Sequence, residues 1–399
     1  MKILFLSYYL LPDQTPGAFR SEALIKALYK KKGRDIKIDI MSSTPNRYSN
    51  YSPINLKKNI SESVRVNRIY VRPHSGGFVD QAISYLYYVR GVLKKVHSED
   101  YDLVFATSSR LMTSVLGVYI AKKKSIPVYI DIRDILLDTI SDLLHSSISL
   151  FLYPILSILE KYVVTNANKI NLVSKGFQDY FETKYPLKEF SFFPNGIDDA
   201  FIQSFNENIT DVNLEESGEN SSLNLLYAGN IGKGQALEKI LPGMAKNFKK
   251  KLNIKVIGGG ANLKLLNKVI IKENISNIMI MDPIDRQDLV AEYINADILF
   301  LHLDNLDCFK KVLPSKIFEY GATGKPILAG VSGYSAKFIQ EEIENAEVFG
   351  PCNSKEALEA FSRLSFLTTS RQSFISKYSR KTLSETMSDD ILDLYSIGE

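Results

Sequence analysis

Lys316 and Glu319 are opposite in charge and stand three positions apart, a spacing that suggests chemistry. On a helix, residues three apart share a face. An ammonium can pair with a phosphate, and a carboxylate can accept hydrogen bonds from the vicinal hydroxyls of a ribose. Such a pair can hold both parts of a nucleoside diphosphate. The alternative is an ordinary solvated pair worth about 0.2–0.5 kcal/mol.

The neighbouring residues predict the helix that would present this pair. Pro314 suits the first helical position, Gly324 offers a left-handed stop, and Pro326 prevents continuation. A short apolar strand at 327–330 follows. The loop that opens into this helix would point free backbone N–H groups at a ligand, and Lys316 would add a full positive charge. We therefore expect a phosphate site here.

Two glycine-bearing turns are further candidates, because close backbone approach to a phosphate requires residues without side chains. The turn at 228–234 follows a predicted strand, and its Lys233 could meet a diphosphate. Gly259, in the run at 258–260, is expected to let a ligand approach the backbone closely. This run lacks the G-x-G-x-x-G spacing of a dinucleotide site, which disfavours an NAD-dependent dehydrogenase.

A charged group at the end of another predicted strand, Asp131, Arg133 and Asp134, is the candidate for the reacting centre. The fixed fork of donors on Arg133 suits negative charge on a diphosphate or an acceptor. Asp134 or Asp131 would orient it or contact an acceptor hydroxyl. The equal alternative is an arginine–carboxylate network that only fixes the loops.

The string at 314–326, PSKIFEYGATGKP, resembles the donor-site signature of the family 4 retaining glycosyltransferases, which have the GT-B fold. It most resembles the bacterial branch related to N-acetylfucosaminyltransferases of polysaccharide assembly, in which P-S-K-x-x-E-Y/A-x-A-x-G-K-P recurs. The resemblance implies two Rossmann-like domains facing a cleft, with the C-terminal domain holding the donor. The donor-binding residues that it implies are Gly17, Gly229, Asn230, Lys233, Gly259, Pro283, Pro314, Ser315, Lys316 and Glu319.

Some positions depart from the wider superfamily. Asn230 stands where an arginine is common, and D-x-R-D stands where His-Asp is more usual at the last two positions. The first acid of E-x7-E, which contacts the transferred sugar in the wider group, is Lys311 here. Either the sugar is held differently, or Lys311 acts on the departing diphosphate. These changes fit a specialised branch, with inactivity as the alternative.

Length and pattern predict two α/β domains, each doubly wound. The 399 residues exceed the roughly 250–300 at which a single core usually stops growing, and apolar runs alternate with amphipathic stretches as in β-α-β units. We expect an acceptor-binding domain at 1–198, joined by a helix at about 380–399, and a nucleotide-sugar domain at 199–379. The stretch 206–222 reads as a linker or insertion. The expected strands are 2–7, 36–41, 103–107, 128–131, 169–173, 223–227, 254–257, 277–281, 297–302 and 327–330, with helices at 20–31 and 109–123.

Charge is uneven along the chain. Up to Asn195 there are 27 Lys and Arg against 17 Asp and Glu, and after it 22 against 28. A basic half suggests an anionic partner, although no nucleic-acid module accompanies it. The apolar stretch 148–159 is too short to span a bilayer. We expect it to form a buried core helix or, as the alternative, an interfacial contact that rests on an anionic leaflet.

The cysteines and histidines favour neither a disulfide framework nor a metal site. Cys308 and Cys352 lack metal-ligand spacing and indicate a reducing compartment, so we expect a cytoplasmic protein, at the inner face of the cell membrane if the leaflet contact exists. The N-terminus is predicted to be a strand and not a signal peptide. None of the four histidines has metal-ligand spacing, and His302 is expected to be packed or at the surface. Cofactors are therefore not expected, and positive groups alone would stabilise the leaving group.

These inferences combine into one hypothesis. The chain would transfer a sugar, N-acetylated or deoxy, with retention from a UDP donor to a lipid-linked or oligosaccharide acceptor in capsule or O-antigen assembly. One alternative is a UDP-N-acetylglucosamine 2-epimerase, which has the same architecture but needs carboxylates for proton transfer. Another is a non-catalytic scaffold of a polysaccharide-assembly complex.

Overall fold

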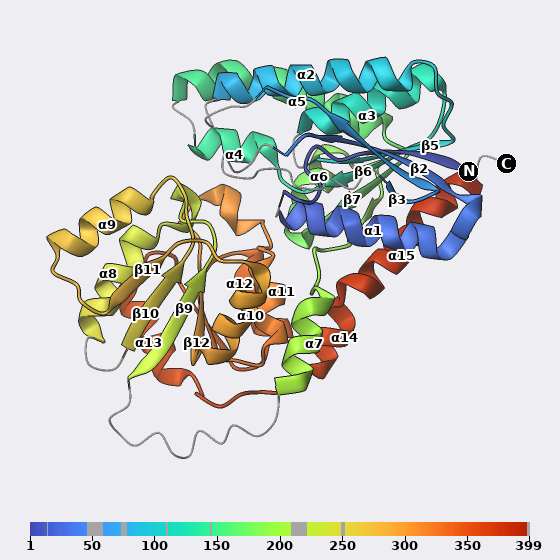
Figure 1. The fold of residues 1–399 in the computed structure, drawn as a ribbon. Coiled ribbons are helices and arrows are strands. Elements are labelled where there is room, and N and C mark those ends of the chain that lie inside the picture. The colour runs from blue at the N-terminus through green and yellow to red at the C-terminus, as the bar shows by residue number, and fades with distance from the viewer. Residues whose placement is uncertain are drawn as a thin grey trace. The chain divides into compact units, whose positions relative to one another are not determined.

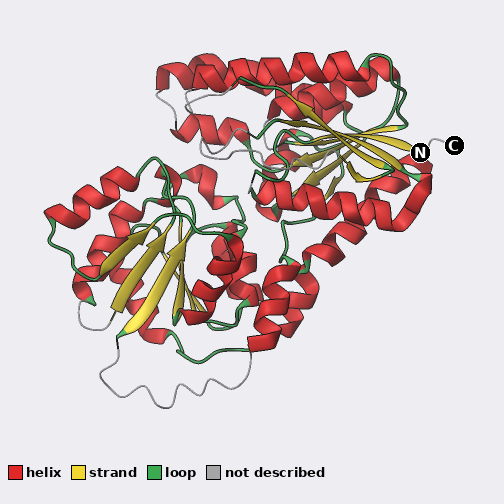
Figure 2. Ribbon diagram, in the orientation of Figure 1, coloured by secondary structure: helices red, strands yellow, loops and turns green. Residues whose placement is uncertain are grey.

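The protein forms two α/β units. The structure is a computed structural model that describes residues 1–13, 15–45, 59–72, 78–108, 111–143, 146–208, 222–248 and 252–396. Unit 1 comprises Met1–Asn195 and Arg380–Glu399, and unit 2 comprises Gly196–Ser379. In each unit, helices cover both faces of a largely parallel sheet (Figures 1 and 2), which confirms the doubly wound class.

Unit 1 has eight described strands in the order β3-β4-β2-β1-β5-β6-β7-β8, and only β3 of these pairs antiparallel. The strands are β1 (Lys2–Leu6), β2 (Lys37–Ser43), β3 (Asn59–Ser61), β4 (Val64–Ile69), β5 (Leu103–Thr107), β6 (Val128–Ile132), β7 (Lys169–Leu172) and β8 (Phe190–Ser191). The helices are α1 (Pro16–Lys32), η1 (Gly33–Asp35), α2 (Phe78–Val96), α3 (Leu111–Lys124), α4 (Leu136–Leu143), α5 (Ser146–Asn166), η2 (Lys175–Phe177), α6 (Gln178–Lys184) and α15 (Arg380–Ser396).

The central strands of unit 1 are buried along their whole length. β5 (LVFAT) and β6 (VYIDI) contain no exposed residue, as parallel strands covered on both faces require. α1 starts where the Thr15 hydroxyl accepts the Ala18 N–H at 3.0 Å, with Pro16 at the first position. α15 packs on α1 and adds an ion pair between Lys30 and Glu385, so the last helix of the chain completes the first unit.

Unit 2 has six described strands, all parallel, in the order β11-β10-β9-β12-β13-β14. They are β9 (Leu223–Ala228), β10 (Leu252–Ile257), β11 (Ile278–Met281), β12 (Ile298–His302), β13 (Ile327–Gly330) and β14 (Ala346–Phe349). The helices are α7 (Asp199–Asn208), η4 (Lys233–Gln235), α8 (Leu237–Asn247), α9 (Leu263–Lys272), α10 (Arg286–Asn295), η5 (Asp307–Lys310), α11 (Lys316–Ala322), α12 (Tyr334–Glu342), α13 (Ser354–Arg363) and α14 (Gln372–Tyr378). Counted within the unit this is the order 3-2-1-4-5-6, which reverses between β9 and β12.

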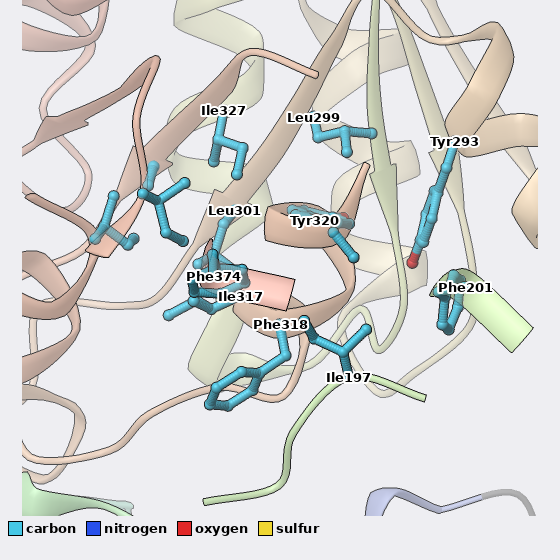
Figure 3. Close-up of a cluster of buried hydrophobic side chains, with 14 of the residues drawn as sticks. Ile197, Phe201, Tyr293, Leu299, Leu301, Ile317, Phe318, Tyr320, Ile327 and Phe374 are labelled. Atoms are coloured by element: carbon cyan, nitrogen blue, oxygen red, sulfur yellow. The ribbon is translucent and has the colours of Figure 1, made fainter. Parts of the chain in front are cut away.

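Side chains on the two faces of the unit 2 sheet pack into two separate hydrophobic cores. Leu225 and Phe300 lie in the cluster that faces α8 and α13, while Leu226 and Leu301 lie in the cluster that contains α11. Figure 3 shows the second cluster. Since both faces of the sheet are apolar, its polar atoms concentrate at the strand ends, where a ligand is bound in this class of fold.

The expectation of a buried core helix at 148–159 is wrong for one face of α5. Leu150 and Ile158 are 79% and 69% exposed, and Tyr153 and Ile155 are also exposed. The cause is layering: α5 packs on α3 and α4, so only the opposite face, which includes Val163 and Val164, is covered. Of the stretch 206–222, residues 206–208 end α7 and 209–221 lie outside the described residues.

Candidate functional site

The site in unit 2 lies at the carboxyl ends of β9 and β12, where the strand order reverses. In open parallel sheets, crossover helices leave opposite faces at this point and open a crevice for ligands. The turn at 229–235 follows β9, and His302 ends β12. The two ends are tied together, because the Asp304 N–H donates to the Gly234 carbonyl at 2.8 Å.

The two predicted glycine turns pack directly on each other. The Gly229 N–H donates to Ile257 O at 2.7 Å, and the Ile231 N–H donates to Gly259 O at 2.8 Å. A side chain at Gly258, which has φ +150°, would fall 1.8 Å from Gly229 O. The absence of a side chain at Gly258 therefore serves the packing of the two turns.

Gly259 and Pro283 are brought together at the edge of this site. A methyl group added at Gly259 would meet only Pro283, at 3.6 Å. Pro283 itself is exposed just after β11. The loops after β10 and β11 therefore leave an open position beside Gly259.

Lys316 reaches the turn from α11. Its Nζ would lie 1.9 Å from a side chain added at Gly229, and it sits 5.4 Å from the centre of the Tyr227 ring. Within the described residues, this ammonium has no ion-pair or hydrogen-bond partner. Burial lowers the pKa of Lys316, which nearby Glu319 partly offsets. A half-buried cation against bare backbone is a seat for an anion.

Glu319 is held by a buried tyrosine. The Tyr293 hydroxyl donates to Glu319 Oε2 at 3.1 Å, and its ring packs edge-on against Tyr320 at 5.3 Å between centroids. Burial raises the pKa of Tyr293 well above its usual value, with a contribution from Glu319, so the phenol keeps its proton and remains a donor. Glu319 thus has a fixed direction, with lone pairs left for a ligand.

The short helix α11 is anchored from below. Ile317, Phe318 and Tyr320 are buried in the cluster of Figure 3, while Lys316 and Glu319 are only half-buried. Gly324 adopts φ +71°, the left-handed conformation expected for a helix stop. The start is different from the prediction, because α11 begins at Lys316, two residues after Pro314.

Arg371 fixes the other end of α11. It is buried and donates to main-chain carbonyls that include Tyr320 O at 3.5 Å and Lys325 O at 3.0 Å. These bonds satisfy carbonyls that the end of a helix leaves open. Arg371 therefore helps to hold Lys316 and Glu319 in place.

The expectation of free N–H groups at the start of α11 is wrong in part. The Ile317 N–H donates to Pro314 O at 3.1 Å, and the Phe318 N–H donates to Ser315 O at 3.1 Å. Pro314 and Ser315 thus form a tight turn that uses these donors. The positive charge here comes mainly from the Lys316 side chain.

The remaining predicted residues of unit 2 surround this centre. Asn230 is exposed and donates to Gln235 Oε1 at 2.9 Å. Lys233 is exposed at the start of η4. Lys311 is half-buried directly after η5, in a loop held by the Ser335 hydroxyl, which donates to Val312 O at 2.6 Å.

In unit 1, both carboxylate oxygens of the candidate Asp131 accept hydrogen bonds within a buried network. The expected contact of Asp131 with an acceptor hydroxyl is therefore wrong. Its oxygens accept from Arg20 at 3.0 and 3.1 Å, from Asn171 at 2.7 Å and from Thr107 at 3.3 Å. Burial alone would raise the pKa of Asp131, but Arg20 outweighs it and the pKa ends below the usual value. The side chain is 1% exposed, so the structural alternative holds for this residue.

Arg133 lies beside Gly17. A side chain at Gly17 would fall 2.8 Å from Arg133 Nη1, and this nitrogen is buried with no hydrogen-bond partner among the described residues. Arg133 Nη2 contacts Asn195 Oδ1 at 3.4 Å. Gly17 belongs to the first turn of α1, and its small size makes room for the guanidinium.

Asp134 keeps an exposed side chain, yet desolvation by the surrounding protein raises its pKa to about 6, against the opposing charge of Arg133. No hydrogen bond joins Asp134 to Arg133 in the described part of the chain. The structure therefore gives Arg133 and Asp134 separate surroundings, and the expected orientation of the guanidinium by a carboxylate is replaced by Asn195.

Three features were not predicted from the sequence. They are Tyr293 behind Glu319, Arg371 behind α11, and the engagement of both ring nitrogens of His302. Each partner is at least 26 residues away along the chain. His302 is fully buried, which confirms a packed histidine.

The described residues contain no group of three or more His, Cys, Asp or Glu gathered as a metal site. In the same ranges, no helix combines the length and the apolar composition needed to cross a bilayer.

Comparison with known proteins agrees with the fold. Residues 211–382 match the family described as "Glycosyl transferases group 1". No curated protein matches the chain. Anabaena Alr3699/HepE, solved with UDP and glucose, is 15% identical with a TM-score of 0.64, over 98% of this chain and 99% of that one. A trehalose-6-phosphate structure from E. coli with UDP-2-fluoro glucose is 10% identical with a TM-score of 0.68, over 99% of each chain.

The lipopolysaccharide outer core galactosyltransferase WaaB is 12% identical with a TM-score of 0.63, over 98% of this chain and 99% of that one. These likenesses confirm the GT-B fold, with two Rossmann-like units. The match over 211–382 places the similarity to this glycosyltransferase domain in unit 2, apart from the last three matched residues. Fold and domain together define the class of this protein, which is a glycosyltransferase.

Proposed function

We propose that this glycosyltransferase moves a sugar with retention from a UDP donor to a lipid-linked or oligosaccharide acceptor in capsule or O-antigen assembly. The observation that carries the proposal is the Lys316 ammonium, which lies against Gly229 and forms no ion pair or hydrogen bond among the described residues. A diphosphate supplies the missing charge. Support for UDP comes from HepE, which was solved with UDP and glucose.

Each part of the donor has a residue that suits it. Lys316, the Gly229 turn and exposed Lys233 would bind the diphosphate, and Glu319, oriented by Tyr293, would accept from the ribose hydroxyls. The open position beside Gly259 would receive the nucleobase. The N-acetylfucosaminyltransferase resemblance favours an N-acetylated or deoxy sugar.

The chemistry would not require a metal ion. As the bond between the anomeric carbon and the phosphate oxygen breaks, negative charge grows on the diphosphate, and fixed cations that already face it lower the barrier. Lys316 and Lys233 would serve in unit 2, Lys311 would assist the departing phosphate, and Arg133 would contact the acceptor in unit 1. The donor phosphate itself would take the acceptor proton during same-face attack.

The test is titration calorimetry with UDP, comparing the wild type with Glu319→Ala. We expect binding by the wild type and a loss of about tenfold or more in the variant, since a hydrogen bond to a charged group contributes about 1.5–3 kcal/mol. Equal affinities, or no binding by the wild type, would remove the nucleotide from the proposal.

Incubation with the UDP-sugar alone, without an acceptor, distinguishes an epimerase from a transferase. An epimerase converts a UDP-sugar without any acceptor, whereas a transferase needs one. Proton transfer at carbon would need free carboxylates, and Asp131 is already engaged by Arg20. A non-catalytic scaffold would show no turnover with any donor and acceptor pair.

We further propose that unit 1 rests on an anionic membrane leaflet, where a lipid-linked acceptor would lie. The surface concerned, the α3–α5 face, is formed by exposed side chains of two packed helices. Its apolar members are Met112, Tyr119, Leu150, Ile155 and Ile158, and its basic members are Lys122, Lys123 and Lys161.

Charge on these helices favours an anionic partner. α3 contains no acidic residue, and in α5 the only one, Glu160, is buried and accepts from Tyr185 and Lys184. Apolar side chains that enter the acyl boundary beside lysines that meet the headgroups are typical of a peripheral membrane surface. These exposed side chains and the charge around them support the proposed interfacial contact of 148–159.

Sedimentation with phospholipid vesicles tests this surface. We expect binding to vesicles that contain phosphatidylglycerol, weaker binding in high salt, and at least a tenfold loss in Leu150→Glu/Ile158→Glu, because each buried aliphatic side chain contributes about 1.5–3 kcal/mol. Ile271→Glu is the matched control, since Ile271 is 75% exposed on α9 of unit 2. An equal effect of this control, or no binding to anionic vesicles, would overturn the membrane contact.

A further inference from the structure

His302 is a buried histidine at the switch point of unit 2. It ends β12, is 0% exposed, and stacks on Phe300 with ring centroids 6.0 Å apart. A side chain at Gly330 on β13 would fall 2.3 Å from His302 Cδ2, so glycine there makes room for the ring. The sheet is thus built to accept an imidazole at this position.

Both ring nitrogens have main-chain partners. Nδ1 lies 2.7 Å from Gln235 O, and Nε2 lies 2.9 Å from the Cys352 nitrogen. A carbonyl only accepts and an amide N–H only donates, so Nδ1 carries the hydrogen and Nε2 carries none. The network therefore assigns one neutral tautomer.

One of these partners belongs to the candidate phosphate turn. Gln235 is the last residue of η4, which starts at Lys233. The preceding carbonyl, Gly234 O, accepts from the Asp304 N–H at 2.8 Å. Two consecutive carbonyls of the turn, those of Gly234 and Gln235, are thus held by Asp304 and His302, at or just after the end of β12.

The second partner lies in the loop after β14. Cys352 adopts φ +61°, a left-handed conformation that side chains other than glycine rarely adopt, and its N–H donates to His302. His302 therefore links two loops that do not share a main-chain bond at this point. Such a bridge holds its loops only while the ring is neutral and present.

We propose that His302 is a positioning residue, which fixes the turn at 229–235 in the conformation that receives the donor diphosphate by bridging Gln235 to Cys352. The inference rests on the proposed function, because it presumes a diphosphate at this turn. It extends that function by naming a residue that never touches the ligand. Neither Gly229 nor Lys233 has a bond to β12 of its own among the interactions of the described residues.

The charged groups near the ring do not compete for its nitrogens. Asp304 pairs with Lys239 at 2.8 Å, and the Cys352 thiol donates to Asp304 at 3.4 Å. Burial lowers the pKa of His302 to about 4, while the Gln235 carbonyl and Asp304 oppose this and Lys239 adds to it. The ring is neutral at physiological pH, and its protonation would place a donor against the Cys352 N–H.

Two variants separate the two hydrogen bonds. In His302→Asn, the amide nitrogen takes the place of Nδ1 and can still donate to Gln235 O. In His302→Gln, the longer side chain carries its oxygen to the place of Nε2 and can accept from Cys352 but not reach Gln235. His97→Asn is the matched control, because His97 is exposed in unit 1.

The readout is the affinity for UDP compared with that for uridine, which has no phosphates. A positioned phosphate turn predicts that His302→Gln weakens UDP at least tenfold while uridine changes less than twofold, and that His302→Asn recovers most of the UDP affinity. A merely structural histidine would weaken both ligands together, so ligand-observed NMR for uridine distinguishes the roles.

Each result bears on a different claim. Loss of UDP and uridine in parallel, or equal UDP affinity in all three variants, would overturn the positioning role. Failure of the wild type to bind UDP would instead overturn the proposed function, and this inference with it. Melting temperatures of the variants, measured in the same buffer, show whether a loss of binding reflects unfolding.

Discussion

Two strand ends, that of β6 in unit 1 and that of β9 in unit 2, both bring positive and negative side chains together, but the buried carboxylate of Asp131 is paired, whereas the ammonium of Lys316 forms no ion pair among the described residues. After β6, Asp131 receives donors from Arg20, Asn171 and Thr107. Beside β9, the Lys316 ammonium lies against Gly229 with no anionic partner in the described ranges. Charge at a strand end is thus no sign of a site by itself. A binding site is indicated where a desolvated charge still lacks its counterion.

The largest expected effect concerns the satisfied pair. Arg20→Met would leave the Asp131 carboxylate buried without its counterion, which typically costs about 3–5 kcal/mol in the free energy of unfolding. Urea denaturation followed by circular dichroism measures it. Lys26→Met is the control, since Lys26 forms an exposed pair with Glu22 on the same helix and should lose less than about 1 kcal/mol. Similar losses in both variants would mean that the Asp131 network is not structural.

The unsatisfied cation should behave in the opposite way. Lys316→Met is expected to lower UDP affinity and turnover about 100-fold, as removal of a preorganised charge does, while the free energy of unfolding stays equal or rises because a desolvated ammonium is removed. Calorimetry and urea denaturation on the same samples test both parts. Lys268→Met, an exposed lysine on α9, is the control. If the variant lost stability instead, Lys316 would be structural.

Two titrating groups, one in each unit, should respond to acid in opposite directions. The pKa of His302 is lowered from 6.5 to about 4, so in that interval the unfolded state binds the proton and the folded state does not. Stability of unit 2 is therefore complete above pH 6.5 and falls toward pH 4, by up to about 3 kcal/mol. Asp134, with its pKa raised from 3.8 to about 6, is protonated first in the folded state, so acid stabilises unit 1 over that interval.

Difference curves against His302→Asn and Asp134→Asn isolate these two contributions. Denaturation midpoints from pH 4 to 7 should show the acid loss reduced in the first variant and enhanced in the second. Difference curves of the same sign for both variants would contradict the assigned protonation states.

The smallest effect concerns the orientation of Glu319. Tyr293→Phe removes one hydrogen bond and keeps the packed ring, so UDP affinity should fall about 3- to 10-fold, in line with about 1 kcal/mol per bond. Tyr88→Phe makes the same change in unit 1, where the hydroxyl donates to Met41 O at 2.7 Å. It should leave UDP affinity unchanged. An equal loss of affinity in the two variants would show that the Tyr293 hydroxyl has no specific role in UDP binding.

The sequence predicted best what is decided locally or by burial on both faces. β5 and β13 have the predicted bounds, because strands covered on both sides are continuous apolar runs. β4 and β14 were missed, since β4 carries Arg65 and Arg68 and β14 is a half-buried edge strand. The stop at Gly324 was readable because a left-handed glycine is a local requirement.

Long-range contacts were beyond this reasoning. The spacing of Lys316 and Glu319 was visible, but not that Tyr293 holds the acid or that Asp131 is consumed by Arg20, 111 residues earlier. The apolar composition of α5 did not reveal that it forms an outer layer on α3. A single sequence shows the periodicity of a helix, but it does not show how many of the helix's faces other elements cover.

The return of α15 to α1 also has a consequence for biosynthesis. Its Asp390 carboxylate accepts from Tyr129 and Ser191 at 2.7 and 2.8 Å, deep in the first-made half of the chain. Synthesis must therefore proceed through α15 before the earliest strands gain this covering, whereas the unit made in between can mature sooner. Deletion of α15 would thus destabilise unit 1, although the helix lies far along the chain from the strands that it covers.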